Sequence, residues 1–267
     1  MTLYFIGLGL GNKKSVSVEG LEIIRKADKV FLENYTSIPV DEKSALEEYY
    51  GKKITLADRN LVEKEAEKII EAGKKGDACF LVSGDVFSAT THTDLYLRAR
   101  KTGVEVKVLN NASIMNAVSI TGLQLYKFGK TTSIVFDDDD WLPETPYNII
   151  KENKERGLHT LCLLDIKTAE PSKENLKKGI DKPEPPRYMT IKEAIKILKK
   201  LEEKMKEKLI TEDLLIIGVA RLGKKDQDIK AGKIKEIEQH DFKGPMHSLI
   251  IPGEMHELEE EMLSLFK

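Results

Sequence analysis

The sequence predicts an α/β protein in which short strands alternate with helices. Three observations support this class: apolar runs recur along the chain, amphipathic helical patterns lie between them, and 267 residues with 40% hydrophobic content suffice for a sizeable core. A chain of this length suits either one large α/β unit or two domains. The alternation also favours a largely parallel sheet, because parallel neighbours need a crossover segment between them.

The expected strands are short runs of β-branched and other large apolar residues. In chain order they are Leu3–Ile6, Lys29–Leu32, Cys79–Ser83, Val104–Leu109, Thr132–Phe136, Thr160–Leu164, Leu214–Val219 and Ser248–Ile251.

Amphipathic helices are expected between several of these strands. One apolar stripe starts at Val62, and a longer one begins at Ile191, behind a capping box formed by Thr190 and Glu193. Met255–Leu265 has the spacing of a last helix.

The strand–helix alternation restarts after a segment of small, mostly uncharged residues, Asn110–Gly129. We therefore expect two domains, residues 1–112 and residues 113–267. Thr168–Arg187 is rich in proline, glycine and charge, which indicates an exposed excursion rather than a domain.

Basic and acidic residues nearly cancel, at 43 against 45, for a net charge of −2. This balance argues against a general nucleic-acid-binding protein, which usually has a basic excess. The cysteines, Cys79 and Cys162, lie in apolar runs and are expected to be buried free thiols. The sequence has no Cys/His spacing typical of a metal site, and no run approaches the roughly 20 apolar residues of a membrane span. We expect a soluble cytoplasmic protein with no metal, nucleic-acid or membrane partner.

A glycine-rich segment, Ile6–Gly11, follows the first expected strand. Its glycines permit a tight turn and a close approach of the backbone to a ligand. Gly11 comes one residue too early for the pyrophosphate-binding pattern G-x-G-x-x-G, which disfavours a dinucleotide site. The segment is either a plain strand-end turn or a loop beside a ligand.

Polar residues follow two other expected strands. Asp85 comes just after Cys79–Ser83, where ligands bind in open parallel sheets, and it either accepts hydrogen bonds from a ligand or caps the next helix. His92, farther along, is more often structural than a ligand. The hydroxyl run Tyr35–Ser37 follows Lys29–Leu32 and is compatible with turn chemistry alone.

Two further features receive no specific role from spacing. Asp137–Asp140 is expected to be a solvated loop, because consecutive acidic side chains cannot all converge on one ion. His247 comes directly before the last expected strand.

A series of short stretches spans nearly the whole chain in order. They are IGLGL at the start, ENYTS at 33–37, GDVFSATTH at 84–92, ASI at 112–114, TGL and YKFGK within 121–130, GLHTLCLLDIK at 157–167, VAR at 219–221 and HSLIIPG at 247–253. Together they resemble the diphthine synthase family, which belongs to the tetrapyrrole-methylase superfamily of S-adenosylmethionine-dependent methyltransferases. ATTH and YKFGK are the more specific stretches. The superfamily's GDP reads GDV here, with Val86 in place of proline.

The resemblance implies two α/β domains with the cofactor in an interdomain cleft, and generally a homodimer. The implied cofactor is S-adenosyl-L-methionine, and its product is S-adenosyl-L-homocysteine. The implied substrate is translation elongation factor 2, methylated in diphthamide biosynthesis on the amino group of the 3-amino-3-carboxypropyl arm of a modified histidine. The implied cofactor contacts are Leu10, Asp85, Ser88, Ser113, Ile114, Leu164, Ala220 and His247.

This chemistry agrees with the residue types. Methyl transfer from a sulfonium is an in-line displacement with an activated leaving group, so positioning and desolvation suffice and no nucleophilic residue is needed. No catalytic residue is assigned, and the number of methyl groups stays open. Tyr35 and Tyr126 are candidates for an aromatic face toward a methylated ammonium.

Two alternatives stay open. Another methyltransferase of the superfamily, acting on a tetrapyrrole or on ribosomal RNA, would share the cofactor site and differ around Glu33–Ser37 and Ala89–His92. A non-catalytic module would bind the adenosyl ligand without turning it over.

Overall fold

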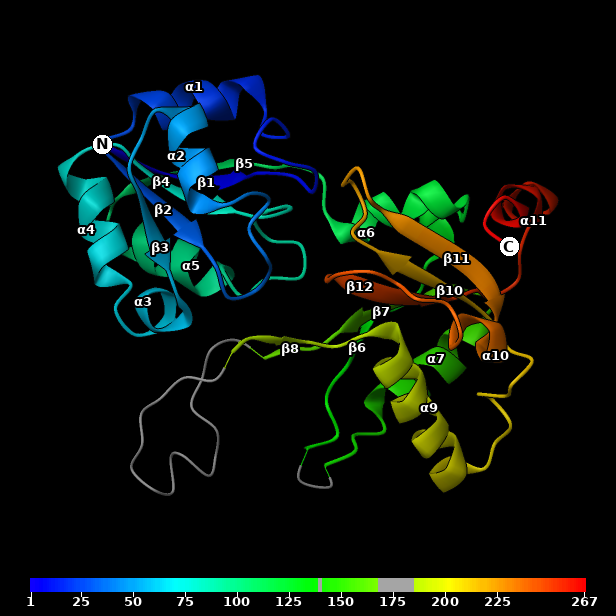
Figure 1. Ribbon diagram of the computed structural model, residues 1–267. Helices are drawn as coiled ribbons and strands as arrows, with labels where there is room; N and C mark the ends of the chain where they lie inside the picture. Colours follow the sequence, from blue (N-terminus) through cyan, green and yellow to red (C-terminus); the bar gives the residue numbers. More distant parts are fainter. Residues whose placement is uncertain (139–140, 168–184) are drawn as a thin grey trace. The chain divides into compact units, whose positions relative to one another are not determined.

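The computed structural model describes residues 1–138, 141–167 and 185–267. The chain divides into two compact units, whose elements are labelled in Figure 1. Unit 1 comprises Met1–Ala117 with Gly223–Lys225, and unit 2 comprises Val118–Leu222 with Asp226–Lys267. The expected boundary lies at 112–113, whereas the units change at 117–118 and unit 1 includes a short loop from the second half of the chain. Most of the expected excursion, residues 168–184, lies outside the described residues.

Unit 1 contains a five-stranded parallel sheet with the strand order β3-β2-β4-β1-β5. The strands are β1 (Thr2–Gly7), β2 (Lys29–Glu33), β3 (Ile54–Ala57), β4 (Ala78–Val82) and β5 (Glu105–Leu109). The helices are α1 (Val18–Lys26), α2 (Lys43–Tyr50), α3 (Arg59–Glu63), α4 (Glu67–Lys75) and α5 (Thr93–Lys101). Because all strands run in the same direction, the loops that follow them emerge at one edge of the sheet.

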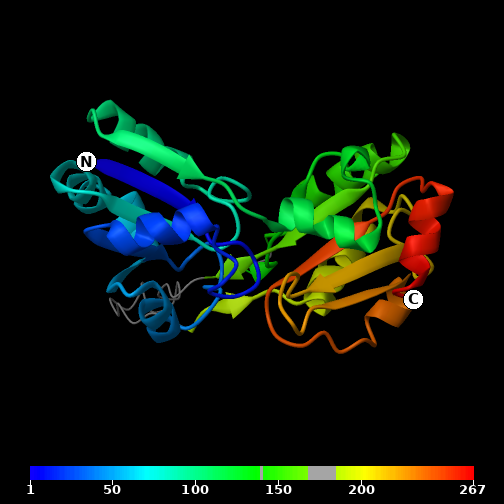
Figure 2. The same cartoon turned by 90° about the horizontal axis from the view of Figure 1, so that it is seen from above.

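Alternating side chains give this sheet two buried faces. Leu3 and Phe5 point into a core completed by α3, α4 and α5, whereas Ile6 points into a second core under α1 and α2. Figures 1 and 2 show the two helix groups on opposite faces of the sheet. Cys79 is a buried free thiol in the second core, as expected, and burial raises its pKa to about 12.

Unit 2 contains a mixed sheet with the order β11-β10-β12-β7-β6. Its strands are β6 (Thr132–Ile134), β7 (Thr160–Leu164), β10 (Leu215–Ala220), β11 (Asp228–Lys233) and β12 (His247–Ile251). Within this sheet only β6 and β7 pair in parallel, and the other neighbouring strands pair antiparallel. The expectation of a largely parallel sheet is therefore right for unit 1 and wrong for unit 2. The reason is that β10 and β11 form a hairpin, which needs no crossover helix.

The helices α7 (Thr145–Glu155), α9 (Ile191–Met205) and α10 (Ile234–Ile237) pack on one face of this sheet around a core that includes Tyr147 and Leu198. α9 begins at the capping box of Thr190 and Glu193 that the sequence predicts. Cys162 is buried in the same core as a free thiol. Smaller elements complete the unit: the 3-10 turns Val118–Thr121 and Leu125–Lys127, the pair β8 (Ile166–Lys167) and β9 (Arg187–Tyr188), and α11 (Glu257–Ser264).

The predicted α/β class is confirmed, and all the expected strands are present. Sequence patterns missed β3 and β11, as well as the two-residue strands β8 and β9. In β3 the two central residues, Thr55 and Leu56, are exposed, and β11 mixes charged residues with Gly232, so neither forms an apolar run. Within the described part of the chain, no helix combines the length and the apolar character needed to cross a membrane.

Candidate cofactor site

The loops after β1 and β4 contact each other at the carboxyl edge of the unit 1 sheet. The Gly9 amide donates to the Gly84 carbonyl at 3.0 Å, and the Gly84 amide donates to the Gly9 carbonyl at 2.8 Å. A Cβ atom on Gly7 would lie only 2.7 Å from the Gly84 carbonyl oxygen. Gly9 and Gly84 also have positive φ angles, of 71° and 79°. The glycine-rich segment therefore allows two strand-end loops to approach closely, which a plain turn would not require.

The Asp85 carboxylate joins the β4 loop to the residues after β5. Its Oδ1 accepts hydrogen bonds from the Phe87 amide at 3.0 Å and from the Ser88 amide and hydroxyl at 3.1 and 2.9 Å. Its Oδ2 accepts from the Asn110 side chain at 3.0 Å and from the Asn111 amide at 3.1 Å. Burial favours the neutral acid, but these hydrogen bonds outweigh it and lower the pKa of Asp85. All these donors come from the chain itself, so Asp85 organises the loops.

Asn111 is a second junction at this edge. Its side-chain amide donates to the carbonyls of Gly7 at 2.9 Å and Ser15 at 3.0 Å, and its Oδ1 accepts from the Ala112 amide at 2.8 Å. Sequence analysis assigned no role to Asn110 or Asn111. Their position directly after an expected strand, at the same edge as Asp85, was the available signal.

Five of the predicted cofactor residues belong to this edge: Leu10, Asp85, Ser88, Ser113 and Ile114. A Cβ atom on Gly84 would lie 3.7 Å from the Leu10 side chain and 3.9 Å from the Ser113 Cα, so these loops are in contact. Ser113 accepts a hydrogen bond from the Met115 amide at 3.1 Å and so caps the short helix α6 (Ile114–Ala117).

The other three predicted residues, Leu164, Ala220 and His247, gather at one edge of the unit 2 sheet. β7 and β10 both run antiparallel to β12, so the ends of these two strands meet the start of β12. Ala220 pairs directly with His247, and Leu164 follows the residue that pairs with Ser248. The structure thus collects the predicted residues into two groups, one in each unit.

Both ring nitrogens of His247 are already hydrogen-bonded. Nδ1 accepts from the amide of Ile191, the first residue of α9, at 3.3 Å, and Nε2 donates to the Gly244 carbonyl at 2.6 Å. Burial lowers the pKa of His247, which favours the neutral ring. The side chain therefore holds the start of α9 in place.

A second set of polar groups lies at the carboxyl ends of β2 and β4. Glu33 is fully buried, and its Oε1 accepts from the amides of Tyr35, at 2.6 Å, and Thr36. Its Oε2 has no hydrogen-bond partner among the described residues. Burial raises the pKa of Glu33 against the opposing effect of the two amides and of the Thr36 side chain.

His92 is also fully buried, with its ring edge-on to Phe80 and Tyr35. Its Nδ1 lies 3.1 Å from the Val86 carbonyl, to which it donates, and Nε2 has no partner in the described part of the chain. Burial lowers the pKa of His92 to about 4. The Tyr35 and Thr91 hydroxyls are hydrogen-bonded at 3.2 Å, so the ENYTS and ATTH stretches are in contact.

The two candidate aromatic residues differ in their surroundings. Tyr35 is only 3% exposed in unit 1, with the Arg59 guanidinium 5.6 Å from its ring centre. Tyr126, in unit 2, is 81% exposed. Tyr35 therefore packs within unit 1, and a role toward a methylated ammonium stays a prediction for both residues.

The acidic run shows ion pairs where it is described. Asp137 pairs with Lys200, and Asp138 pairs with Lys167. Residues 139–140 lie outside the described residues. No cluster of histidine, cysteine and acidic side chains suited to a metal ion occurs in residues 1–138, 141–167 and 185–267.

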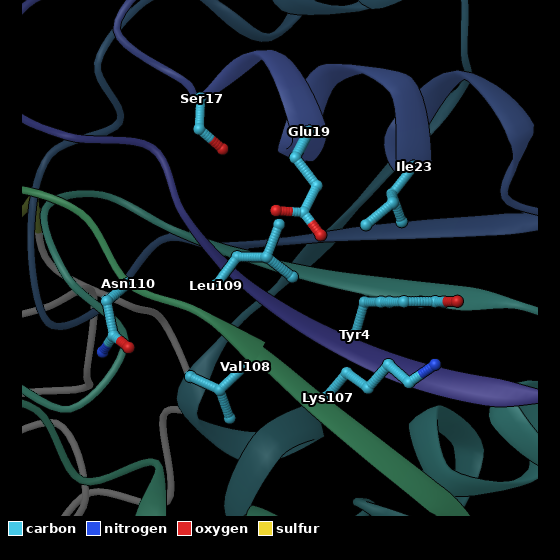
Figure 3. Close-up of a pocket in the computed structure, with 8 residues that line it drawn as sticks. All are labelled: Tyr4, Ser17, Glu19, Ile23, Lys107, Val108, Leu109 and Asn110. Atoms are coloured by element: carbon cyan, nitrogen blue, oxygen red, sulfur yellow. The ribbon is translucent and has the colours of Figure 1, made fainter.

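A pocket of about 480 Å³ lies between α1 and the β1–β5 side of the unit 1 sheet (Figure 3). Figure 3 shows Glu19 reaching from α1 toward Leu109, and the Lys107 ammonium lies 5.9 Å from the Tyr4 ring centre. Asn110 connects this pocket to Asp85. The full lining is Tyr4, Ser17, Glu19, Ile23, Lys107, Val108, Leu109 and Asn110, which includes none of the predicted cofactor residues.

Comparison with known proteins assigns the class. The family model of tetrapyrrole (corrin/porphyrin) methylases matches residues 2–238 of the chain. The chain therefore belongs to the tetrapyrrole methylase family, and it is a methyltransferase.

Its relatives place it more narrowly within that family. The diphthine methyl ester synthases of Bos taurus and Homo sapiens are each 51% identical to it over 269 residues, covering 99% of this chain and 94% of theirs. The diphthine methyl ester synthase of Dictyostelium discoideum is 48% identical, covering 100% of this chain and 98% of its own. The chain is thus a member of the diphthine methyl ester synthase group, as the sequence motifs predict.

Solved structures agree with this placement. One from Entamoeba histolytica, described as a candidate diphthine synthase, has a TM-score of 0.88 and 43% identity, covering 100% of this chain and 98% of that chain. A crystal structure of diphthine synthase has a TM-score of 0.84 and 33% identity, with coverage of 100% and 96%. The tetrapyrrole-methylase-like fold is therefore confirmed.

Proposed function

We propose that this chain is an S-adenosyl-L-methionine-dependent methyltransferase of diphthamide biosynthesis that acts on translation elongation factor 2. It methylates the amino group of the 3-amino-3-carboxypropyl arm on a modified histidine. The observation that carries the proposal is the full-length similarity to diphthine methyl ester synthases, at 51% identity over 99% of this chain. Because the name of these relatives specifies an ester, the proposal includes methylation of the carboxylate on the same arm.

Two observations, one in each unit, support the proposed cofactor. Glycines at the ends of β1 and β4 allow the two strand-end loops to pack closely, and Asp85 fixes the loop that carries Ser88. In unit 2, Ala220 and His247 are paired at the sheet edge. The residues proposed to contact the cofactor are Leu10, Asp85, Ser88, Ser113 and Ile114 of unit 1, and Leu164, Ala220 and His247 of unit 2.

When bound, the cofactor supplies a methyl group on a positively charged sulfur, so the departing S-adenosyl-L-homocysteine is neutral. The chain's own residues contribute positioning and exclusion of water. Asp85 and Asn111 serve this purpose by fixing the loops that follow β1, β4 and β5. The acceptor amine attacks in its neutral form, so its proton leaves to water or to a nearby acceptor before transfer.

We further propose that the protein acts in the cytoplasm as a homodimer, the commonest form of soluble oligomer. Light scattering at micromolar concentration should then give about 60 kDa, which is twice the chain mass of 30.2 kDa. A mass near that of one chain would contradict the dimer.

The acceptor is tested by mixing the enzyme with labelled S-adenosyl-L-methionine and elongation factor 2 carrying the unmethylated arm. Mass analysis should show stepwise methyl addition, and mild alkali should remove only the ester methyl group. The control is a factor without the arm, and equal labelling of both proteins would exclude the proposed substrate. Labelling of a tetrapyrrole or ribosomal RNA would support another member of the family. Failure to form S-adenosyl-L-homocysteine with any of these acceptors would support a binding module.

A further inference from the structure

The buried polar atoms that lack partners among the described residues include Oε2 of Glu33 and Nε2 of His92, near the ends of β2 and β4. Both side chains are 0% exposed. A buried polar atom without a hydrogen bond is rare and unfavourable, so each atom indicates a missing group. Tyr35 adjoins both residues, through its amide bonded to Glu33 and its ring against His92.

Strand register places the two side chains on the same face of the unit 1 sheet. Phe31 pairs with Phe80 across β2 and β4, and both belong to the core completed by α3, α4 and α5. Glu33 lies two residues beyond Phe31 and therefore faces the same side. His92 packs edge-on against Phe80, with ring centres 5.1 Å apart.

The hydrogen-bond pattern makes Nε2 of His92 an acceptor, and Oε2 of Glu33 is an acceptor above the raised pKa of its carboxyl group, where that group is ionised. Nδ1 of His92 carries the proton donated to the Val86 carbonyl, which leaves a lone pair on Nε2. An ionised carboxylate oxygen also only accepts. A ligand that satisfies both atoms must be small and must donate two hydrogens, as water and a primary amine do.

We propose that Glu33 and His92 form a subsite for a small hydrogen-bond donor, and that during the reaction this donor is the amino group of the acceptor arm. The identity of the amine rests on the function proposed above. His92 belongs to the same β4–α5 connection as Asp85, so the subsite adjoins the loop assigned to the cofactor. A neutral primary amine that donates both hydrogens here keeps its lone pair free for attack on the methyl group.

This arrangement predicts that the contribution of the subsite decreases from the first methyl transfer to the third. The amine has two N–H groups before the first transfer, one before the second and none before the third. The subsite therefore positions the first transfer most strongly and the third not at all. A residue with a purely structural role would slow every step alike.

Two variants separate the acceptor role from packing. In Glu33→Gln, the amide oxygen still accepts from Tyr35 and Thr36, while an NH₂ donor replaces the free oxygen. His92→Phe keeps the ring volume, and the Val86 carbonyl still accepts from the Thr90 hydroxyl at 2.6 Å.

Ser83→Ala is the matched control. The Ser83 hydroxyl is likewise buried without a partner among the described residues. However, Ser83 comes directly after Val82, the last residue of β4, and continuing the alternation of this strand by one residue places Ser83 on the opposite face of the sheet from Val82.

Single-turnover mass analysis should show the first transfer slowed about 10- to 100-fold in Glu33→Gln and His92→Phe, with the third changed by no more than about twofold. Cofactor affinity by calorimetry should match that of Ser83→Ala, and urea unfolding should confirm that each variant is folded. Uniform slowing of all steps, or rates equal to those of the control, would overturn the assignment of the amine.

A crystallographic experiment tests the subsite independently of transfer activity. The wild-type protein is crystallised with and without methylammonium chloride. Methylammonium within hydrogen-bond distance of Glu33 Oε2 and His92 Nε2 would support the amine, and water alone in both crystals would support a donor subsite held by water. An empty space in both crystals would overturn the subsite. Because this experiment needs no acceptor protein, it distinguishes failure of the subsite from failure of the proposed function.

Discussion

The Asn110 side chain donates a 3.0 Å hydrogen bond to Asp85, a residue 25 positions earlier in the chain. This bond joins the ends of β4 and β5 at the edge assigned to the cofactor. Asp85→Ala removes the shared acceptor of several loop donors, so it should lower the free energy of unfolding by about 2–4 kcal/mol and weaken cofactor binding. Asn110→Ala should weaken binding in the same direction by a smaller amount, about 1–2 kcal/mol.

Urea unfolding and calorimetry measure the two effects separately. Asp85→Ala with unchanged stability and lost cofactor binding would make Asp85 a direct ligand contact instead of an organiser of the loops.

The close contact at Gly7 gives a second prediction. Because a Cβ atom there would lie 2.7 Å from a backbone oxygen and 2.9 Å from the Asn111 Cβ, Gly7→Ala should destabilise unit 1 by more than about 2 kcal/mol. Gly51→Ala is the control, since Gly51 has a φ of 68° and nothing within 4 Å of the new Cβ. Its expected loss is only about 1 kcal/mol, from backbone strain. Equal losses in urea unfolding would show that the Gly7 loop relaxes.

Much of the fold was predictable because buried strands and amphipathic helices leave periodic apolar patterns. β11 was not predicted because it has no apolar run of its own, and it is held in the sheet by pairing with β10. The antiparallel arrangement of unit 2 was equally hidden, since strand direction depends on which distant strands pair.

The candidate site was predictable only in part. Position after a strand indicated Asp85, but its hydrogen bonds to Asn110 and Asn111 depend on β4, β1 and β5 being neighbours in the sheet. The hydroxyl run Tyr35–Ser37 was compatible with a plain turn, and one Glu33 oxygen does accept from the Tyr35 amide in that turn. That its other oxygen has no partner among the described residues depends on the packing around it, which no local pattern records.

A buried carboxylate in unit 2 provides a third prediction. Glu259 is 1% exposed and accepts hydrogen bonds from the Gln124 amide at 2.8 Å, the His256 amide at 2.7 Å and the His159 ring at 3.0 Å. In Glu259→Gln, an NH₂ group replaces one of the two accepting oxygens, so at least one of these donors loses its acceptor. The free energy of unfolding should therefore fall by about 2–4 kcal/mol at pH 7. Glu260→Gln, at an exposed position of the same helix, should change it by less than about 0.5 kcal/mol.

The difference in the free energy of unfolding between wild type and Glu259→Gln should be smaller at acidic pH. Burial alone would raise the pKa of Glu259, but its hydrogen bonds lower it to about 2, from 4.5 in the unfolded chain. The stabilisation is therefore complete above pH 4.5 and declines as the pH falls toward 2. A difference between Glu259→Gln and wild type that stays constant over this range would contradict the lowered pKa.

His92 gives the last prediction, in a different pH window. Burial lowers its pKa to about 4, whereas the unfolded chain takes up the proton near 6.5. Between these values the unfolded state binds the proton and the folded state does not, so folding stability falls as the pH drops from 6.5 to 4. The shift corresponds to about 3 kcal/mol of stability lost across the window.

In His92→Phe this contribution is absent, so the urea midpoint of the variant should fall less than that of wild type as the pH is lowered through the window. Glu33 acts in the opposite direction, because its raised pKa makes the folded state bind the extra proton and stability falls as the pH rises above 4.5. In Glu33→Gln, the stability relative to wild type should therefore grow as the pH is raised. If the urea midpoints of wild type and His92→Phe change with pH in parallel, the pKa of His92 is the same in the folded and unfolded states. That result would contradict the lowered pKa.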